Sequence, residues 1–327
     1  MSVCIVAPAF SYSWCKVAEQ IANVLRSEGY NVEVIKLSHY LPKPRMYRNM
    51  IIVGDLIQAF RLLTPYAQYV IWYYDAPSIC LNKRLVRYSF YGVESKFTFI
   101  PNSKWAKTVL ESYGLKNITE PIHHGIDSNI WYPKASFKTY DFIYYSLYHE
   151  RKGFDRLSQI ASKLPNYKFR VISNTLLRDK VTFPQNVTVE YDLGTLTEYE
   201  LFERVVNAKA YIQISYYEGF GITTLEAYCS GLNIIAPNIE PFNEYLPHDD
   251  VLWVEAYRDY SDVISYRVRG LTATYTLVMP KIKFNIEEFC QKCIEALKKP
   301  INIAKRQLYG KSYDYRLLYK RFREFLK

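Results

Sequence analysis

The sequence predicts an α/β protein whose two halves are each a parallel sheet wrapped by helices. Short apolar runs alternate with amphipathic stretches over residues 1–113, which is typical of strands joined by crossover helices. A loop-rich stretch at 121–133 interrupts this alternation, and a second series begins at Tyr140. With 327 residues, the chain is long enough for two domains that each bury a core.

The elements of the first half follow from these two patterns. Helices are expected where apolar residues recur every three to four positions, and strands where the apolar runs are short. Strands are expected at 2–9, 31–37, 49–55, 69–75 and 97–100. Helices are expected at 14–28, 56–63, 81–91 and 103–113, with Gly114 ending the last one.

The second half continues the alternation without any internal repeat. Strands are expected at 140–145, 167–172, 187–191, 210–214 and 233–236, with helices between them. After Glu240 the pattern weakens: residues 257–279 are not placed, a helix is expected at 289–297, and the segment 309–326 is aromatic, basic and amphipathic. Ligands of such sheets bind at the carboxyl ends of the strands, so the chemistry is sought there.

A glycine-containing turn between two carboxylates is the most informative motif. Glu218 and Glu226 lie eight positions apart, and Gly219 and Gly221 precede a helix expected from Thr223 to about residue 230. Glycine is scarce, at 12 in 327 residues, so both glycines are expected to serve the backbone. Amides at such a turn, together with the positive end of the helix, suit a diphosphate. The two carboxylates suit the hydroxyls of a hexose and a ribose.

An alternative for Glu226 remains open at this point. The run Thr223-Thr224-Leu225-Glu226 is also a capping box, in which Glu226 would bond the backbone of Thr223 and need no ligand. Glu218 lies outside that box, and a carboxylate next to two tyrosines needs hydrogen-bond donors.

Four motifs in order resemble the retaining GT-B glycosyltransferases of the family 4 type. They are Glu218 through Glu226 with the run to Ala236, the 121–133 link, Lys152-Gly153-Phe154-Asp155, and the 186–214 region. The resemblance is close over about 97–250 and implies the GT-B architecture, in which two Rossmann-like parallel-sheet domains face each other across a cleft. It implies an acceptor-side domain at 1–135, on which a helix at about 309–327 packs back, and a donor-binding domain at 136–308.

The resemblance also implies an activity. A hexosyl group would pass from a nucleotide-diphosphate sugar to an acceptor hydroxyl with retained configuration, without a metal or any cofactor beyond this co-substrate. Lys152 is the first choice to bind the diphosphate and Arg151 the second, because the family's usual arginine is replaced by Leu147. Glu218, Lys152 and Asp75 form the expected catalytic set.

The donor site implied by the resemblance has further members. The backbone at the turn is expected to contact the donor, and the base is expected beside loops that follow two second-half strands, one at Ser173-Asn174-Thr175 and one at Asp192-Leu193-Gly194. The expected donor-binding residues are Arg151, Lys152, Glu218, Gly219, Phe220, Gly221, Ile222, Thr223, Glu226, Asn174 and Leu193. The identity of the base and of the sugar is open.

The acceptor side departs from the family pattern. Ser11 and Ser13 occupy the first turn, where the family often has two glycines, and they are expected to hydrogen-bond instead. Asp75 stands where a family histidine often lies, and it would orient or deprotonate an acceptor hydroxyl. The alternative for Asp75 is a turn before Pro77. His124 replaces a more usual asparagine, and turn packing is favoured over catalysis for it.

Composition widens the list of partners. The chain has a net charge of +10 and 32 tyrosines, and basic aromatic stretches occur at 43–48, 83–88 and 315–323. Such stretches suit an anionic membrane surface or a phosphorylated acceptor, and nucleic acid is less favoured; a solvated basic face is the alternative. The acceptor is expected to be phosphorylated, lipid-linked or a saccharide.

Other features limit the location and the class of protein. No apolar run reaches 18 residues and the start lacks the pattern of a signal peptide, so a cytoplasmic protein is expected, with peripheral attachment to the inner face of a membrane as an option. The six scattered cysteines indicate neither disulfides nor a zinc site. Two other functions stay open: a sugar-nucleotide epimerase or hydrolase of similar fold, and a non-catalytic basic binding protein.

Overall fold

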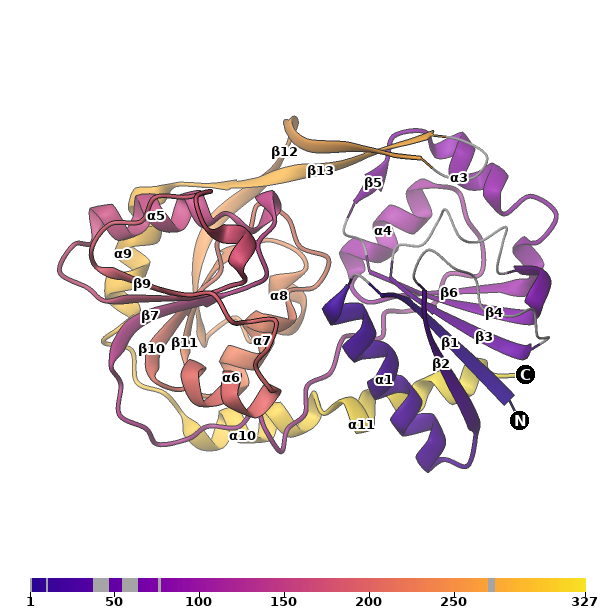
Figure 1. The fold of residues 1–327 in the computed structure, drawn as a ribbon, viewed down its shortest axis with the longest axis horizontal. Helices are drawn as coiled ribbons and strands as arrows, with labels where there is room; N and C mark the ends of the chain where they lie inside the picture. Colours follow the sequence, from indigo (N-terminus) through magenta and orange to yellow (C-terminus); the bar gives the residue numbers. More distant parts are fainter. Residues whose placement is uncertain (1, 10, 38–46, 55–63, 76–77, 270–273) are drawn as a thin grey trace. The chain divides into compact units, whose positions relative to one another are not determined.

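The computed structural model describes residues 2–9, 11–37, 47–54, 64–75, 78–269 and 274–327. The chain divides into two compact units (Figure 1). Unit 1 comprises Met1–Gly125, Ser265–Met279 and Tyr315–Lys327, and unit 2 comprises Ile126–Ile264 and Pro280–Asp314. The helix expected at 56–63, the basic residues 43–46 and the turn at Pro77 lie outside the described residues.

Unit 1 contains a five-stranded parallel sheet in the order β2-β1-β3-β4-β6 (Figure 1). All five strands confirm the expected positions to within two residues. They are β1 (Ser2–Pro8), β2 (Asn31–Leu37), β3 (Tyr47–Val53), β4 (Ala67–Tyr74) and β6 (Phe97–Pro101). The helices described in this unit are α1 (Tyr12–Ser27), α3 (Lys83–Ser89) and α4 (Lys104–Ser112), with α11 (Tyr315–Leu318) from the end of the chain. Gly114 follows α4 with φ +71°, as a residue ending a helix often does.

The core of unit 1 joins the start of the chain to its end. Ile5 of β1, Ile21 of α1 and Ile51 of β3 are fully buried in one cluster with Tyr319 and Phe322. These two aromatic residues belong to a 3-10 helix, Tyr319–Phe325, that follows α11. Burial in this core thus explains the aromatic residues Tyr319 and Phe322 of the last segment.

Unit 2 contains a parallel sheet in the order β12-β11-β10-β7-β8-β9. Its strands are β7 (Tyr140–Tyr145), β8 (Phe169–Ile172), β9 (Val187–Glu190), β10 (Ala208–Ile212), β11 (Asn233–Asn238) and the first part of β12 (Val251–Arg269). Its helices are α5 (Phe154–Lys163), α6 (Glu198–Val205), α7 (Ile222–Cys229), α8 (Phe242–Tyr245), α9 (Ile286–Ala296) and α10 (Ile303–Ser312). The five expected strands of the second half are therefore confirmed.

The segment that the sequence pattern left unplaced forms two long strands. β12 pairs with β11 from Val251 to Glu255. β13 (Thr274–Phe284) lies next to β12 in the sheet order (Figure 1). Within unit 1, Leu277 of β13 pairs antiparallel with Cys80 of the short strand β5 (Ile79–Cys80). Among the described residues, no helix combines the length and the apolar character needed to cross a bilayer.

Candidate functional site

The glycine-containing turn precedes α7 as expected, and the backbone conformation at position 221 requires a glycine. Gly221 is the N-cap of α7, with φ +86° and ψ 54°. A Cβ added there would lie 2.7 Å from a ring carbon of Phe242, closer than real Cβ contacts allow. No side chain caps this helix, so the capping-box alternative for Glu226 and Thr223 is wrong.

Tyr245 holds the turn from outside. Its ring stacks on Phe220 with 4.3 Å between ring centroids. Its hydroxyl donates a bifurcated hydrogen bond to the carbonyls of Phe220 and Gly221, at 3.0 and 3.1 Å. Burial raises the pKa of Tyr245 well above its ordinary value, so the hydroxyl keeps the proton that it donates. The backbone of the turn is thus fixed before any ligand binds.

Glu218 lies at the centre of a charged cluster. One carboxylate oxygen accepts hydrogen bonds from Lys152 Nζ at 2.6 Å and Ser215 Oγ at 2.8 Å, and the other accepts one from Arg151 at 2.9 Å. The Glu218 side chain is 7% exposed. Burial alone would raise its pKa, but attraction by Lys152 and Arg151 outweighs burial and lowers it. The carboxylate is therefore ionised, and the three side chains carry one net positive charge.

The two cations are placed by a short 3-10 helix, Glu150–Lys152, that follows β7. It ends at Gly153, whose φ is +67° and whose added Cβ would lie 2.3 Å from the carbonyl oxygen of Ile214. Tyr144 donates a hydrogen bond to the Lys152 carbonyl at 2.8 Å, and the N–H of Tyr216 donates to the Arg151 carbonyl at 2.7 Å. Two segments far apart in sequence are in this way locked together.

Glu226 is buried one turn inside α7. Tyr145 donates to its carboxylate at 3.1 Å and also contacts the carbonyl of Thr223 at 2.9 Å. Tyr211 bonds the Thr223 hydroxyl at 2.8 Å, and Gln213 donates to the Thr224 hydroxyl at 2.7 Å. Side chains from the ends of β7 and β10 therefore orient the first turn of α7.

The two loops expected beside a base also lie at this edge. Asn174 and Asp192 pair across adjacent loops, because they follow the neighbouring strands β8 and β9. The side-chain oxygen of Asn174 accepts from the Tyr148 N–H at 3.0 Å, and the N–H of Leu193 donates to the Ser173 carbonyl at 2.9 Å. The structure thus brings the residues expected to bind a donor to one edge of one sheet.

Several supporting residues were missed by sequence reasoning. Tyr145, Tyr211, Ser215 and Tyr245 hold the glutamates and the turn, yet none belongs to a recognised motif. The available signal was the number of tyrosines, two of which, Tyr145 and Tyr211, lie in expected strands. A buried tyrosine combines an apolar ring with a donor, which suits this supporting role.

The acceptor-side candidates all lie in unit 1. Ser11 is the N-cap of α1 and accepts a hydrogen bond from the N–H of Trp14, while its hydroxyl is 3.5 Å from that of Ser13. Asp75 directly follows β4 and accepts from the Trp14 indole at 2.9 Å. His124 is buried, and its Nε2 is 3.8 Å from the same Asp75 oxygen. The structure brings Asp75 and His124 together and adds Trp14, which sequence reasoning missed.

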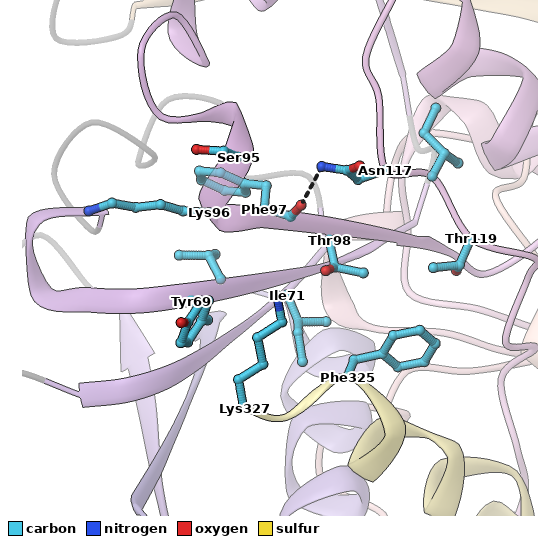
Figure 2. A pocket seen from close by; sticks show the side chains of 12 residues that line it. Tyr69, Ile71, Ser95, Lys96, Phe97, Thr98, Asn117, Thr119, Phe325 and Lys327 are labelled. Carbon is cyan, nitrogen blue, oxygen red and sulfur yellow. Dashed lines mark hydrogen bonds between the residues drawn. The ribbon is translucent and has the colours of Figure 1, made fainter.

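Two cavities have walls that include none of Asp75, Glu218 and Glu226. One, of about 330 Å³, lies in unit 1 at the opposite end of β4 from Asp75. Figure 2 shows Lys327 reaching toward Tyr69, with Thr98 and Phe325 on its other side. The other cavity, of about 270 Å³, lies in unit 2. It is beside the segment that carries Arg151 and Lys152, and its walls include Tyr148, His149, Phe154, Tyr216 and Lys281.

Residues 133–266 match the family described as Glycosyl transferases group 1. A protein of Sulfolobus islandicus rod-shaped virus 1, described as an uncharacterized glycosyltransferase, is 26% identical over 94% of this chain and 96% of its own length. Among the described residues, no group of three or more His, Cys, Asp or Glu side chains is arranged to hold a metal ion.

The fold is that of known glycosyltransferases. The sucrose-phosphate synthase of Thermosynechococcus elongatus matches with a TM-score of 0.69 at 12% identity, over 99% of this chain and 98% of its own. HepE of Anabaena, solved in complex with UDP and glucose, matches with the same score, identity and coverage. The chain therefore has the GT-B fold that its sequence predicted, and residues 133–266 match the pattern of glycosyl transferases group 1.

Proposed function

We propose that this protein transfers a hexosyl group from a nucleotide-diphosphate sugar to an acceptor hydroxyl, with retained configuration and without a metal. The observation that carries the proposal is the cluster of Glu218, Arg151 and Lys152 within residues 133–266, the segment that matches glycosyl transferases group 1. Support for a nucleotide-sugar donor comes from the fold that the chain shares with HepE, which was solved with UDP and glucose.

The chemistry of the donor follows from the charges. When the bond from the anomeric carbon to the diphosphate breaks, negative charge grows on the leaving oxygen. Lys152 and Arg151 would meet that charge together with the positive end of α7. Glu218, held ionised, would accept hydrogen bonds from the hexose, and Glu226 from the ribose. Asn174 and Leu193 would flank the base.

On unit 1, Asp75 would act on the acceptor. A carboxylate at the carboxyl end of a strand can orient a hydroxyl and take its proton as the new bond forms. Ser11 and Ser13 would offer hydroxyls beside it, although Ser11 is engaged as the cap of α1. His124 contributes through Asp75 rather than by direct contact, because its ring is buried.

The exposed basic face of α3 is the proposed contact with anionic lipid. Lys83, Arg84 and Arg87 are exposed, and Tyr88 and Tyr91 are 59% and 84% exposed beside them. Cations with interfacial aromatic residues favour an anionic bilayer surface. Such a contact suits a lipid-linked or phosphorylated acceptor and a peripheral cytoplasmic enzyme. Sedimentation with phosphatidylglycerol vesicles at low salt tests it: the protein should pellet, and Arg84→Glu should weaken pelleting.

A thermal-shift screen across UDP-, GDP-, ADP- and TDP-sugars tests the donor proposal. A donor at one hundred times its Kd should stabilise the fold by about 2.7 kcal/mol, because it binds only the native state. Glu218→Gln should reduce that shift for the same donor. If no nucleotide sugar shifts the unfolding temperature at millimolar concentration, the donor site is refuted.

A further inference from the structure

Trp14 reaches Asp75 because a glycine makes room for its ring. The indole Nε1–H donates to Asp75 Oδ2 at 2.9 Å. The ring lies against Gly54, where an added Cβ would lie within 2.5 to 2.9 Å of three indole atoms. Gly54 also has φ +98°, in the left-handed region that other residues rarely adopt. The sequence thus provides a dedicated place for the indole at the end of β3, beside the carboxylate at the end of β4.

The partners of His124 fix which nitrogen carries its proton. Tyr73 has one hydroxyl proton and donates it to the Ile122 carbonyl at 2.7 Å. In the 3.1 Å contact between the Tyr73 hydroxyl and His124 Nδ1, we therefore infer that the histidine donates. The Tyr319 hydroxyl is a longer neighbour of the same nitrogen, at 3.5 Å. Burial raises the pKa of Tyr73 well above its ordinary value, so this hydroxyl keeps its proton.

Asn102 fixes the other nitrogen. Ser103 Oγ donates to the side-chain oxygen of Asn102 at 3.2 Å, which leaves the Asn102 NH₂ group to face His124 Nε2 at 3.0 Å. An NH₂ group only donates, so Nε2 must accept. His124 is accordingly the neutral Nδ1–H tautomer. The lone pair of its Nε2 accepts a hydrogen bond from Asn102, so Nε2 presents no proton to Asp75.

The other charged and titratable groups near Asp75 come from three elements. Tyr73 of β4 and Tyr319 of the C-terminal 3-10 helix both interact with Asp75, and Lys16 of α1 interacts with Tyr319. Burial raises the pKa of Tyr319 as well, so both phenols stay neutral. The nearest histidine is neutral through its hydrogen bonds, so the Asp75 carboxylate is not neutralised by an imidazolium.

We propose that Trp14 and neutral His124 are positioning residues for Asp75: Trp14 holds the ionised carboxylate toward the acceptor hydroxyl, and His124 leaves that carboxylate basic enough to take the acceptor proton. The inference rests on the proposed transfer. In that reaction the acceptor oxygen bonds the anomeric carbon, the bond from that carbon to the diphosphate breaks, and the nucleoside diphosphate leaves with the electron pair. The acceptor proton moves to Asp75 and then to water. An indole N–H stabilises the ionised carboxylate, whereas a neutral histidine adds no positive charge that would make the carboxylate a weaker base.

A nuclear magnetic resonance experiment on the full chain tests the geometry without any substrate. Trp14→Phe identifies the Trp14 indole N–H among the five tryptophans in a ¹⁵N-labelled sample. We expect that signal to move in Asp75→Asn and to titrate with pH in the wild type only. We expect the His124 nitrogen shifts to show protonation at Nδ1. An indole signal unchanged in Asp75→Asn, or a proton on His124 Nε2, overturns the inference.

Turnover of the donor tests whether Trp14 positions Asp75 for catalysis. The probe is the nucleotide sugar with the largest thermal shift, with water as acceptor and nucleoside diphosphate release as readout. Asp75→Asn should lower kcat by about 10² to 10⁴, as for loss of a general base. Trp14→Phe should lower it by about tenfold, the effect of one hydrogen bond, with the donor KM unchanged. Trp253→Phe loses a comparable indole hydrogen bond in unit 2 and is the control.

Asn102→Asp separates positioning from packing. The new carboxylate has nearly the size of the amide but accepts hydrogen bonds, so it would draw a proton to His124 Nε2 and turn the ring into a cation beside Asp75. We expect kcat to fall by about tenfold or more at an unchanged donor KM, because the cation makes the Asp75 carboxylate a weaker base. Equal kcat in Trp14→Phe, Asn102→Asp and wild type overturns the inference. A wild type without turnover on any donor refutes the proposed transfer instead.

Discussion

Replacement of Lys152 by alanine removes one of the two cations that the structure places against Glu218. Lys152 is 14% exposed, and its Nζ is 2.6 Å from the Glu218 carboxylate. If Lys152 meets the charge on the leaving diphosphate, the loss resembles removal of one oxyanion donor, about 10² to 10³ in kcat or about 2.7 to 4 kcal/mol of transition-state stabilisation. Arg151 stays at 2.9 Å from Glu218, so the carboxylate keeps one cation.

The same change has a smaller effect on folding. Glu218 loses one charge-assisted hydrogen bond but keeps those from Arg151 and Ser215, so the free energy of unfolding should fall by about 1 to 3 kcal/mol. Nucleoside diphosphate release measures the first effect, and thermal unfolding the second. Lys163→Ala is the matched control, because Lys163 also pairs with a glutamate in unit 2, at 2.5 Å, but both side chains are largely exposed. An exposed pair contributes little to stability, and we expect kcat to be unchanged.

The reasoning fails if Lys152→Ala keeps wild-type kcat while remaining folded. It also fails if Lys163→Ala loses as much turnover as Lys152→Ala, because the effect would then follow from general loss of positive charge. Lys152→Arg should retain most of the turnover, since it returns a cation to the same segment.

Three other predictions concern the same unit. Gly221→Ala should destabilise the fold by more than 1 kcal/mol, because of its positive φ and the 2.7 Å contact with Phe242, whereas Gly194→Ala, with no atom within 4 Å of its added Cβ, should not; urea unfolding compares them. Tyr245→Phe should lower the unfolding free energy by about 0.5 to 1.5 kcal/mol and weaken the thermal shift by the donor. The lowered pKa of Glu218 means that its stabilisation is complete above its ordinary value of 4.5 and is lost as pH falls through the lowered value; acid titration should show less of this loss in Glu218→Gln.

The strands could be predicted from sequence because each is a short apolar run, and burial of such runs is what a parallel sheet requires. β2 and β7 agree with the expected bounds at both ends. The start of α7 was placed one residue late, because its cap is a glycine with positive φ and not the threonine that local preference favours. Residues 257–279, which include most of β12 and the first half of β13, were not placed, since polar and charged residues interrupt the apolar ones over 257–269 without a helical period.

The candidate site was predictable where a charge had no local explanation. Glu218, Arg151 and Lys152 were recognised from their motifs, and the structure brings them within hydrogen-bond distance. The partners of Asp75 were not recognised, because a tryptophan 61 positions away and a histidine in a link have no pattern that joins them. Contacts of that kind depend on how β3, β4 and α1 pack, and sequence spacing carries no information about them.

The abundance of tyrosine has a structural reason at the edge of the unit 2 sheet. Tyr144, Tyr145, Tyr211 and Tyr245 each place a ring in the core and a hydroxyl on a carbonyl, carboxylate or side-chain hydroxyl of the candidate donor site. Burial raises the pKa of all four above the ordinary value, so each remains a neutral donor at physiological pH. A cationic scaffold would compete with Lys152 for Glu218, whereas a neutral one leaves the net charge of the cluster to the cations that would face a diphosphate. The tyrosines thus fix the geometry of the site without altering its charge.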